Sequence, residues 1–360
     1  MAVLDKSAPP VESLSGQKLP SWSLPAILVA TIAVTALLFA TTGFAGRAGF
    51  LVFAAVLFLV AQSAVSFAVE GRRQAVDRFF TTTVYVAFLL AALPLAVITW
   101  YTVKEGFGVL SSDFLLSSMF RINPEGVGGG IYHAIVGTLV QSLLATALAA
   151  PIGILAAIYL VEYGGGRPFA RAVSLFVDVM TGVPSIVAGL FVYAFWILAL
   201  GFQKSGLAGA LALFILMLPI VIRSSEEMLK LVPMDLREAS YALGVPKWRT
   251  ILKVVLPTAL AGIITGVMLG VARIAGETAP LLLLVGINQQ IEFNPFAGTE
   301  DPNPQAALPT YIFEQFGTAV GNTEAPAFER AWGAALVLII IIGLLSLIAR
   351  LVARLARVRG

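Results

Sequence analysis

Two charged side chains stand four residues apart in the apolar segment VARIAGETAPLLLL, residues 271–284. In a helix, Arg273 and Glu277 would share one face and partly neutralise each other. Ionisable residues inside a membrane are costly, and they usually face a cavity, a partner or a transport path. The guanidinium of Arg273 would stay protonated and present a planar fork suited to phosphate-like oxygens. Two interpretations stay open: a structural pair that lets a polar face pack, or an arginine that lines an anion pathway, with Glu277 holding its fork or preventing permanent capture of the anion.

The residues around this pair favour a break in the helix. Gly276 allows close approach, Thr278 supplies a hydroxyl, and Pro280 would disrupt the helix just beyond. Broken helices near the middle of a membrane commonly present backbone groups to a substrate. The surroundings therefore favour the anion pathway over the purely structural pair.

The composition indicates that most of the chain lies in lipid. Of 360 residues, 59% are hydrophobic and 12% are charged, and the mean hydropathy is +0.93. Soluble domains usually carry about twice that share of charge. The apolar runs have the length of helices that cross a bilayer, not the ~10-residue alternation of a membrane β-barrel. We therefore expect an all-α polytopic membrane protein.

The residue inventory excludes several chemistries. There is no cysteine, which excludes disulfides, thiol catalysis and cysteine-ligated metals. There is one histidine and no cluster at ligand spacing, so no metal site is expected.

Hydropathy predicts eight membrane spans. They are 24–44, 48–69, 80–103, 132–160, 173–200, 206–222, 257–285 and 331–350. Most of the 23 lysines and arginines then fall on one side, including the C-terminal run RLVARLARVRG. By the positive-inside rule, this side and both termini are predicted to be cytoplasmic. The basic residues serve as topology anchors, so the net charge of +3 is no sign of nucleic-acid binding.

Two connections are too long to be turns: an outer segment, 286–329, and an inner loop, 223–256. The inner loop contains VPMDLREASYALGVPKWRTILKVVLP, a pattern typical of two short helices with a break. Asp235 can cap the first helix, with a glutamate at the capping-box position, Gly244 can end it in the left-handed conformation, and Pro246 can begin the second. From these residues alone, an interfacial helix pair and a docking surface are equally compatible with the loop.

The same loop resembles the EAA loop of ABC-importer permeases. That pattern is Glu-Ala-Ala, three residues, Gly, nine residues, Ile, any residue, Leu-Pro, and the spacing matches throughout, with Ser240 replacing the third Ala and Val254 replacing Ile. In that family the loop is a coupling helix that docks into a cleft of the ATP-hydrolysing subunit. The resemblance implies ATPase-coupling roles for Glu238, Ala239, Ser240, Gly244, Leu256 and Pro257. The chain has no GxxxxGK[ST] phosphate loop, so ATP hydrolysis would belong to a partner.

Further segments resemble the phosphate ABC-importer permeases of the PstA type. These segments are VPSIVAGLFVYAF, LPIVIRSSEEMLKLVP, REASYALGVPKW and ARIAGETAPLL. The resemblance implies a subunit that moves inorganic phosphate by alternating access, with Arg273 and Arg223 mattering for its passage, so that the predicted pathway residues are Arg273, Glu277, Thr278 and Arg223. From its position at the end of a span, Arg223 is equally compatible with an interfacial anchor.

The resemblance begins near residue 70. It implies that 70–360 is the six-helix permease domain. A cytoplasmic tail, 1–23, and two additional transmembrane helices, 24–69, would precede it. The sequence offers no basis for choosing a role for these two helices.

The PstA resemblance also implies partners and a location. The partners would be a second homologous permease subunit, two ATP-binding cassette subunits and an extracytoplasmic phosphate-binding protein. The membrane would be the bacterial cytoplasmic (inner) membrane. The chain itself would be no enzyme and would bind no cofactor, because ATP-Mg would lie on the partner ATPase.

Two other functions compete with phosphate import. An ABC permease for another oxyanion, such as sulfate or molybdate, would keep the coupling loop. An ion-driven secondary transporter or channel would need no docking loop at all.

Overall fold

The computed structural model describes residues 18–43, 46–298 and 304–358, and all regular structure in these ranges is helical, as predicted. The chain divides into two compact units, 1–99 and 100–360, with the boundary inside helix α3. In the described ranges, seven helices are long and apolar enough to cross a membrane, and a sharply bent pair brings the number to eight if it counts as one span. The all-α, polytopic fold class is therefore confirmed.

The first unit consists of α1 (Ser23–Thr42), α2 (Arg47–Glu70) and most of α3 (Arg72–Phe107). The bounds of α1 and α2 lie within two residues of the predicted spans 24–44 and 48–69. The carboxylate of Glu70 ties this unit together: it accepts hydrogen bonds from the Leu19 amide at 2.7 Å, the Ser66 hydroxyl at 2.7 Å and the Arg78 guanidinium at 2.6 Å. A buried carboxylate with three donors is well satisfied.

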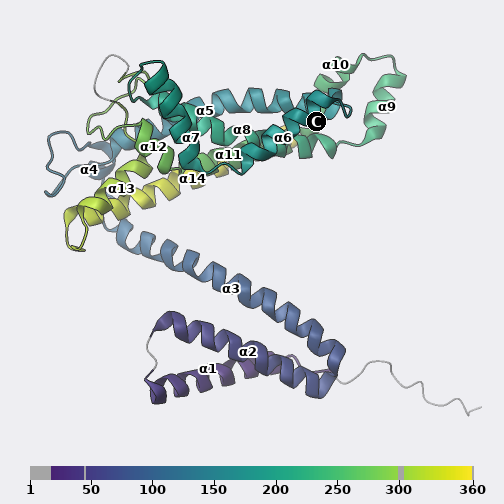
Figure 1. The fold of residues 1–360 in the computed structure, drawn as a ribbon, viewed down its shortest axis with the longest axis vertical. Coiled ribbons are helices and arrows are strands. Elements are labelled where there is room, and N and C mark those ends of the chain that lie inside the picture. The colour runs from purple at the N-terminus through teal and green to yellow at the C-terminus, as the bar shows by residue number, and fades with distance from the viewer. Residues whose placement is uncertain (1–17, 44–45, 299–303, 359–360) are drawn as a thin grey trace, which may run out of the picture. The chain divides into compact units, whose positions relative to one another are not determined.

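The second unit contains the remaining helices (Figure 1). In chain order they are α4 (Ser112–Leu116), α5 (Tyr132–Ile158), the π-helical turn η1 (Tyr159–Tyr163), α6 (Pro168–Thr181), α7 (Ser185–Val192), the π-helical η2 (Tyr193–Ala199), α8 (Gly206–Lys230), α9 (Met234–Ala242), α10 (Lys247–Thr250), η3 (Ile251–Val255), α11 (Leu256–Ala275), α12 (Ala279–Leu284), α13 (Leu308–Thr318) and α14 (Pro326–Val358). Within this unit, α4 and α13 lie at one end and α9 and α10 at the other, hereafter the α13 end and the α9 end.

The core of this unit is built from small residues. Helices α5 and α8 pack along each other, and Ala145, Ala149, Ala208 and Ala212 are completely buried between them and their neighbours. Small side chains let membrane helices approach closely, where dispersion contacts replace the hydrophobic effect as the source of stability. Helix α11 packs against both α8 and α14, so the segments with charged residues rest on a rigid core.

Several predicted spans differ from the structure, and α3 and α14 extend beyond 80–103 and 331–350 at both ends. The span 173–200 is two helices, α6 followed by α7–η2, bent by 107°. Pro184 precedes α7 and lacks the amide proton that a continuous helix would use. The predicted span 206–222 continues to Lys230, and the helix predicted over 257–285 starts earlier, at Lys247, and ends at Ala275.

The inner loop is correspondingly shorter than 223–256. Helix α9 begins at Met234 and has no side-chain cap, so the prediction that Asp235 caps it is wrong. Pro233, with φ −55°, takes the position before the first helical residue, two residues ahead of Asp235. The left-handed Gly244 is confirmed at φ 73°, and Pro246 does precede the next helix, α10.

Candidate substrate pathway and coupling surface

The Arg273 pair, Arg273 with Glu277, lies at a real break between two helices. Helix α11 ends at Ala275, and α12 begins at Ala279 with Pro280 in its first turn. Arg273 and Glu277 form an ion pair across this break, with Thr278 as the residue preceding α12. The Glu277 side chain is 7% exposed, whereas that of Arg273 is 59% exposed. The acid is therefore enclosed by protein, while more than half of the Arg273 side chain is open to the surroundings.

A close contact with α7 fixes the helix after the break. A Cβ atom placed on Gly189 of α7 would lie 2.7 Å from the Cα of Pro280, so only glycine permits this approach. Helix α12 therefore packs directly on the α7 backbone. The break that holds the Arg273 pair is positioned by this packing.

The Arg223 cluster consists of Arg223 on α8 with Ser174, Asp178, Glu226 and Lys230. Arg223 donates to Glu226 at 2.5 Å, to the Ser174 hydroxyl at 2.9 Å and to the Ser174 carbonyl at 3.0 Å, and it pairs with Asp178. Glu226 also accepts from Lys230 at 2.7 Å. Two acids balance two bases, and they join α8 to α6. The guanidinium of Arg223 is thus already bound on several sides.

The two arginines lie at different depths. Helices α8 and α11 run antiparallel, because Gly270 faces Met217 and Gly266 faces Ser224, the residue after Arg223. Arg273 is seven residues beyond Gly266, which places it about 10 Å further toward the α13 end at 1.5 Å per residue. The structure therefore brings Arg273, Glu277 and Thr278 together and assigns Arg223 to a second charged group nearer the α9 end.

The coupling surface is the exposed side of α9 and α10. It includes large apolar side chains at high exposure, with Leu243 83% and Met234 61% exposed, and Leu236 and Trp248 also exposed. Glu238, Ala239 and Gly244 lie on this surface as well. An apolar patch outside the spanning helices is typical of a docking site for another protein.

Not all of the predicted coupling residues are on that surface. Ser240 is 8% exposed and its hydroxyl lies 2.8 Å from that of Thr250, which holds α9 against α10. Leu256 and Pro257 begin α11, a full turn after α10. Gly244 closes α9: its amide donates to the Tyr241 carbonyl at 2.9 Å, and its positive φ would strain any residue with a side chain.

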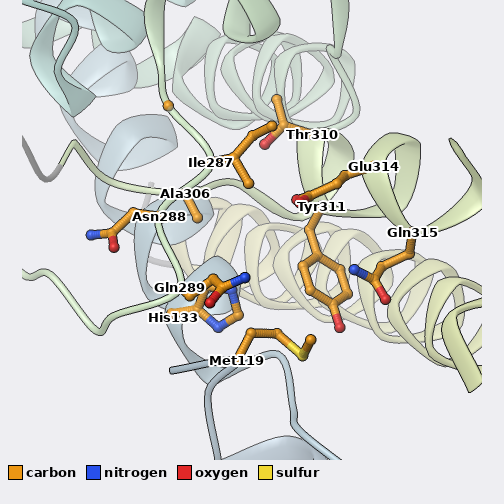
Figure 2. Close-up of a pocket in the computed structure, with 11 residues that line it drawn as sticks. Met119, His133, Ile287, Asn288, Gln289, Ala306, Thr310, Tyr311, Glu314 and Gln315 are labelled. Carbon is orange, nitrogen blue, oxygen red and sulfur yellow. The ribbon is translucent and has the colours of Figure 1, made fainter. Parts of the chain in front are cut away.

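A small polar pocket lies at the α13 end (Figure 2). It has room for about one water molecule, ~10 Å³. His133 and Tyr311 are both 3% exposed there, and their rings meet edge to face at 5.5 Å. Burial raises the pKa of the Glu314 carboxyl and that of the Tyr311 hydroxyl.

Sequence reasoning missed most of the acids in these groups. The segment RSSEEMLK, 223–230, offered a signal, because Arg223, Glu226 and Lys230 are spaced three and four residues apart. Asp178 offered none, since it comes from another helix. From the sequence alone, the buried Arg237 is only part of the loop pattern, and Glu162 has no role beyond lying in a segment that resembles the family.

These features define a polytopic helical membrane protein with buried ion pairs between its helices and an exposed apolar loop at one end. A family model described as "Binding-protein-dependent transport system inner membrane component" matches residues 149–358. The phosphate transport system permease protein PstA 1 of Mycobacterium tuberculosis (strain H37Rv) is 48% identical over 282 residues, which is 78% of this chain and 88% of that protein. PstA of Yersinia pestis is 41% identical over 71% of this chain and 82% of that protein.

This chain belongs to that family of transport permeases, and within it to the PstA-type phosphate transport permeases. The resemblance drawn from the sequence motifs is thus confirmed. Among solved structures, an inward-facing MetNI methionine ABC transporter is similar, with a TM-score of 0.48 and 20% identity over 63% of this chain and 94% of that chain.

Proposed function

We propose that this chain is the permease subunit of an ATP-driven importer of inorganic phosphate, and that Arg273 lines the path of the anion. The observation that carries this role is the asymmetry of the Arg273 pair: the acid is enclosed, and the arginine is mostly open. An enclosed carboxylate orients the guanidinium but leaves donors on its outer edge for an oxyanion. Thr278 adds a hydroxyl beside them.

Glu277 has a second effect in this proposal. It lowers the net positive charge at the break, so that a bound phosphate is released toward the α9 end. A site that binds an ion in transit must be strong enough to receive it and weak enough to let it leave. Arg223, about 10 Å further along, would be a second contact for the phosphate once its ion pairs with Asp178 and Glu226 open.

In this proposal, the energy of ATP hydrolysis reaches this chain through the coupling surface. The exposed Leu243, Met234 and Trp248 around Gly244 suit a cleft in a separate ATPase subunit, as the EAA resemblance implies. ATP-Mg would bind to that partner, two copies of which would serve this chain and a second, homologous permease. This chain would bind no cofactor of its own.

The location and the delivery of substrate complete the proposal. The α9 end would face the cytoplasm of a bacterial cell, in its inner membrane, with both termini on the same side, in agreement with the positive-inside rule. An extracytoplasmic phosphate-binding protein would deliver phosphate at the α13 end.

The test is ATP-dependent uptake of labelled phosphate into proteoliposomes that hold this chain, its partner permease and the ATPase, with binding protein outside and sulfate as competitor. Because Arg273→Gln leaves Glu277 enclosed without its base, the double variant Arg273→Gln/Glu277→Gln is measured beside it; it removes both charges and keeps both shapes. Both variants are expected to lose at least about 100-fold of uptake, the scale of losing charge-assisted contacts to an anion.

Arg171→Gln is the matched control, since Arg171 is exposed on α6 and, among the described residues, its side chain forms no ion pair with either charged group; its uptake should be normal. Normal uptake by the double variant would mean that the Arg273 pair has only a structural role in packing. Uptake that sulfate competes away would favour another oxyanion.

A secondary transporter is distinguished by Gly244→Asp. Uptake that continues in this variant, and without ATP, would contradict coupling through α9; the proposal expects uptake to be lost, because an aspartate strains the left-handed turn and adds charge to the coupling surface.

A further inference from the structure

Glu162 lies where three segments meet at the α9 end. It belongs to η1, which continues α5. Its side chain is 6% exposed and lies 3.1 Å from the guanidinium of Arg237, on α9, which is 8% exposed. Both charges are therefore removed from solvent, and each is the other's neutralising partner.

Arg237 is also bound to the end of α8. Its guanidinium donates to the Leu229 carbonyl at 2.8 Å and to the Val232 carbonyl at 2.9 Å. The last carbonyls of a helix have no partner within the helix and carry partial negative charge, so a cation there is stabilised. Through one side chain, α9 is joined to both α8 and η1.

The second half of the coupling surface is attached to the same residue. Lys247, which begins α10, donates to the backbone carbonyl of Glu162, and its ammonium lies 5.0 Å from the ring centre of Tyr163. With Ser240 bonded to Thr250, α9 and α10 form one stiff body whose two attachments both reach η1.

Helix α5 runs from this point to the α13 end. There the Leu308 amide donates to the Thr138 hydroxyl at 2.7 Å, and the Gln141 amide donates to the Ala306 carbonyl at 3.3 Å. Both acceptors and donors are buried. One helix thus holds the coupling surface at its C-terminal end and the segment leading into α13 near its N-terminal end.

We propose that the Glu162–Arg237 ion pair is the contact through which movement of the coupling surface is passed to α5, and through α5 to the segment around α13. The inference rests on the proposed function, in which a partner ATPase moves α9. Glu162 is a positioning residue: it touches no substrate, and it makes α5 follow α9. Without its charge, α9 stays attached to α8 through Arg237, and only the contact of Lys247 with the Glu162 backbone still joins the coupling surface to η1, so that α5 follows α9 less closely.

The experiment measures phosphate taken up and ATP hydrolysed by the complete transporter in the same proteoliposomes. Glu162→Gln keeps the shape of the side chain and removes its charge. Its ATP hydrolysis should continue while phosphate moved per ATP falls about tenfold, within the usual range of coupling between sites. Glu227→Gln is the matched control, because Glu227 is an exposed acid on α8 at the same end, and it should keep the wild-type ratio.

A purely structural role for Glu162 would lower hydrolysis and uptake in parallel and leave their ratio unchanged, and that result would overturn the inference. If Glu162→Gln fails to assemble, the double variant Glu162→Gln/Arg237→Gln decides, since it leaves no buried charge unpaired. A wild-type ratio in the double variant contradicts the inference, and a reduced ratio supports it. Failure of the wild-type transporter to move phosphate would instead contradict the proposed function.

Discussion

The Arg273 pair and the Arg223 cluster contain the same cation in two different settings. Arg273 meets one acid, Glu277, and keeps 59% of its side chain exposed. Arg223 is 27% exposed and is bound by Asp178, Glu226 and Ser174. An arginine offers five donors, so the first has donors left for an anion and the second has used most of its own.

The difference teaches that a matching motif does not tell whether an arginine is available. Both arginines fall in segments that resemble the same permease family, yet only one is open in this conformation. The acids of the Arg223 cluster occupy the positions that phosphate oxygens would take. For Arg223 to bind phosphate, α6 and α8 must first separate.

The largest effect, a loss of stability, is expected from replacing Arg223, the central residue of the Arg223 cluster. Arg223→Gln leaves Glu226, whose side chain is 11% exposed, with Lys230 alone, and should cost about 3 kcal/mol of unfolding free energy, because breaking a buried pair leaves a charge poorly compensated. The measurement is denaturant unfolding in detergent. An unchanged unfolding curve would mean that Arg223 is as available as Arg273.

An effect of about tenfold on transport is expected from Glu277→Gln. Without its acid, Arg273 should bind phosphate more tightly and release it more slowly, so both the KM and the maximal rate of uptake fall. Initial rates over a range of phosphate concentrations measure both. A rise in KM would show that Glu277 serves mainly to orient the guanidinium of Arg273, and less to weaken its binding of phosphate.

A smaller effect is expected from Asp178→Asn. Asp178 is 61% exposed, and exposed ion pairs contribute roughly 1 kcal/mol or less. We expect little change in stability and a weaker hold on Arg223, seen as a change in uptake of no more than about fivefold, the equivalent of that energy. A stability loss as large as that of Arg223→Gln would place Asp178, not Glu226, at the centre of the cluster.

The smallest effect is expected from an acid in neither group. Burial raises the pKa of Glu314 above 4.5, so its neutral form is favoured in the fold. The stability this provides is fully present below pH 4.5 and is lost as pH rises through the raised pKa. Glu314→Gln should therefore raise the unfolding midpoint slightly at pH 7 and leave it unchanged below pH 4.5. An equal shift at both pH values would exclude ionisation as its cause.

Hydropathy and local spacing account for what was predictable. Runs of apolar residues predicted α1 and α2 to within two residues, and the spacing of four predicted the Arg273–Glu277 pair. The helix end at Gly244 followed from a single residue's conformational freedom.

The parts that could not be predicted depend on contacts between distant segments. Asp178 and Ser174 become partners of Arg223 because α6 packs against α8, and no local pattern contains that contact. Glu162 and Arg237 are separated in the sequence by α6, α7, η2 and α8, and they meet because η1, which continues α5, lies beside the end of α8. Asp235 failed as a cap because Pro233 determined the start of α9 first.

The helix that carries Arg273 has a mechanical consequence. Residues Lys247–Ala275 form one helical path without an intervening loop, so α10 of the coupling surface and Arg273 lie near opposite ends of one continuous helix. The 26 residue steps from Lys247 to Arg273 correspond to about 39 Å, and a tilt of about 5° at one end displaces the other by roughly 3 Å. A displacement of that size is enough to break a hydrogen bond between Arg273 and an oxyanion, because hydrogen bonds weaken steeply beyond ~3.2 Å. The oxyanion is then free to move on.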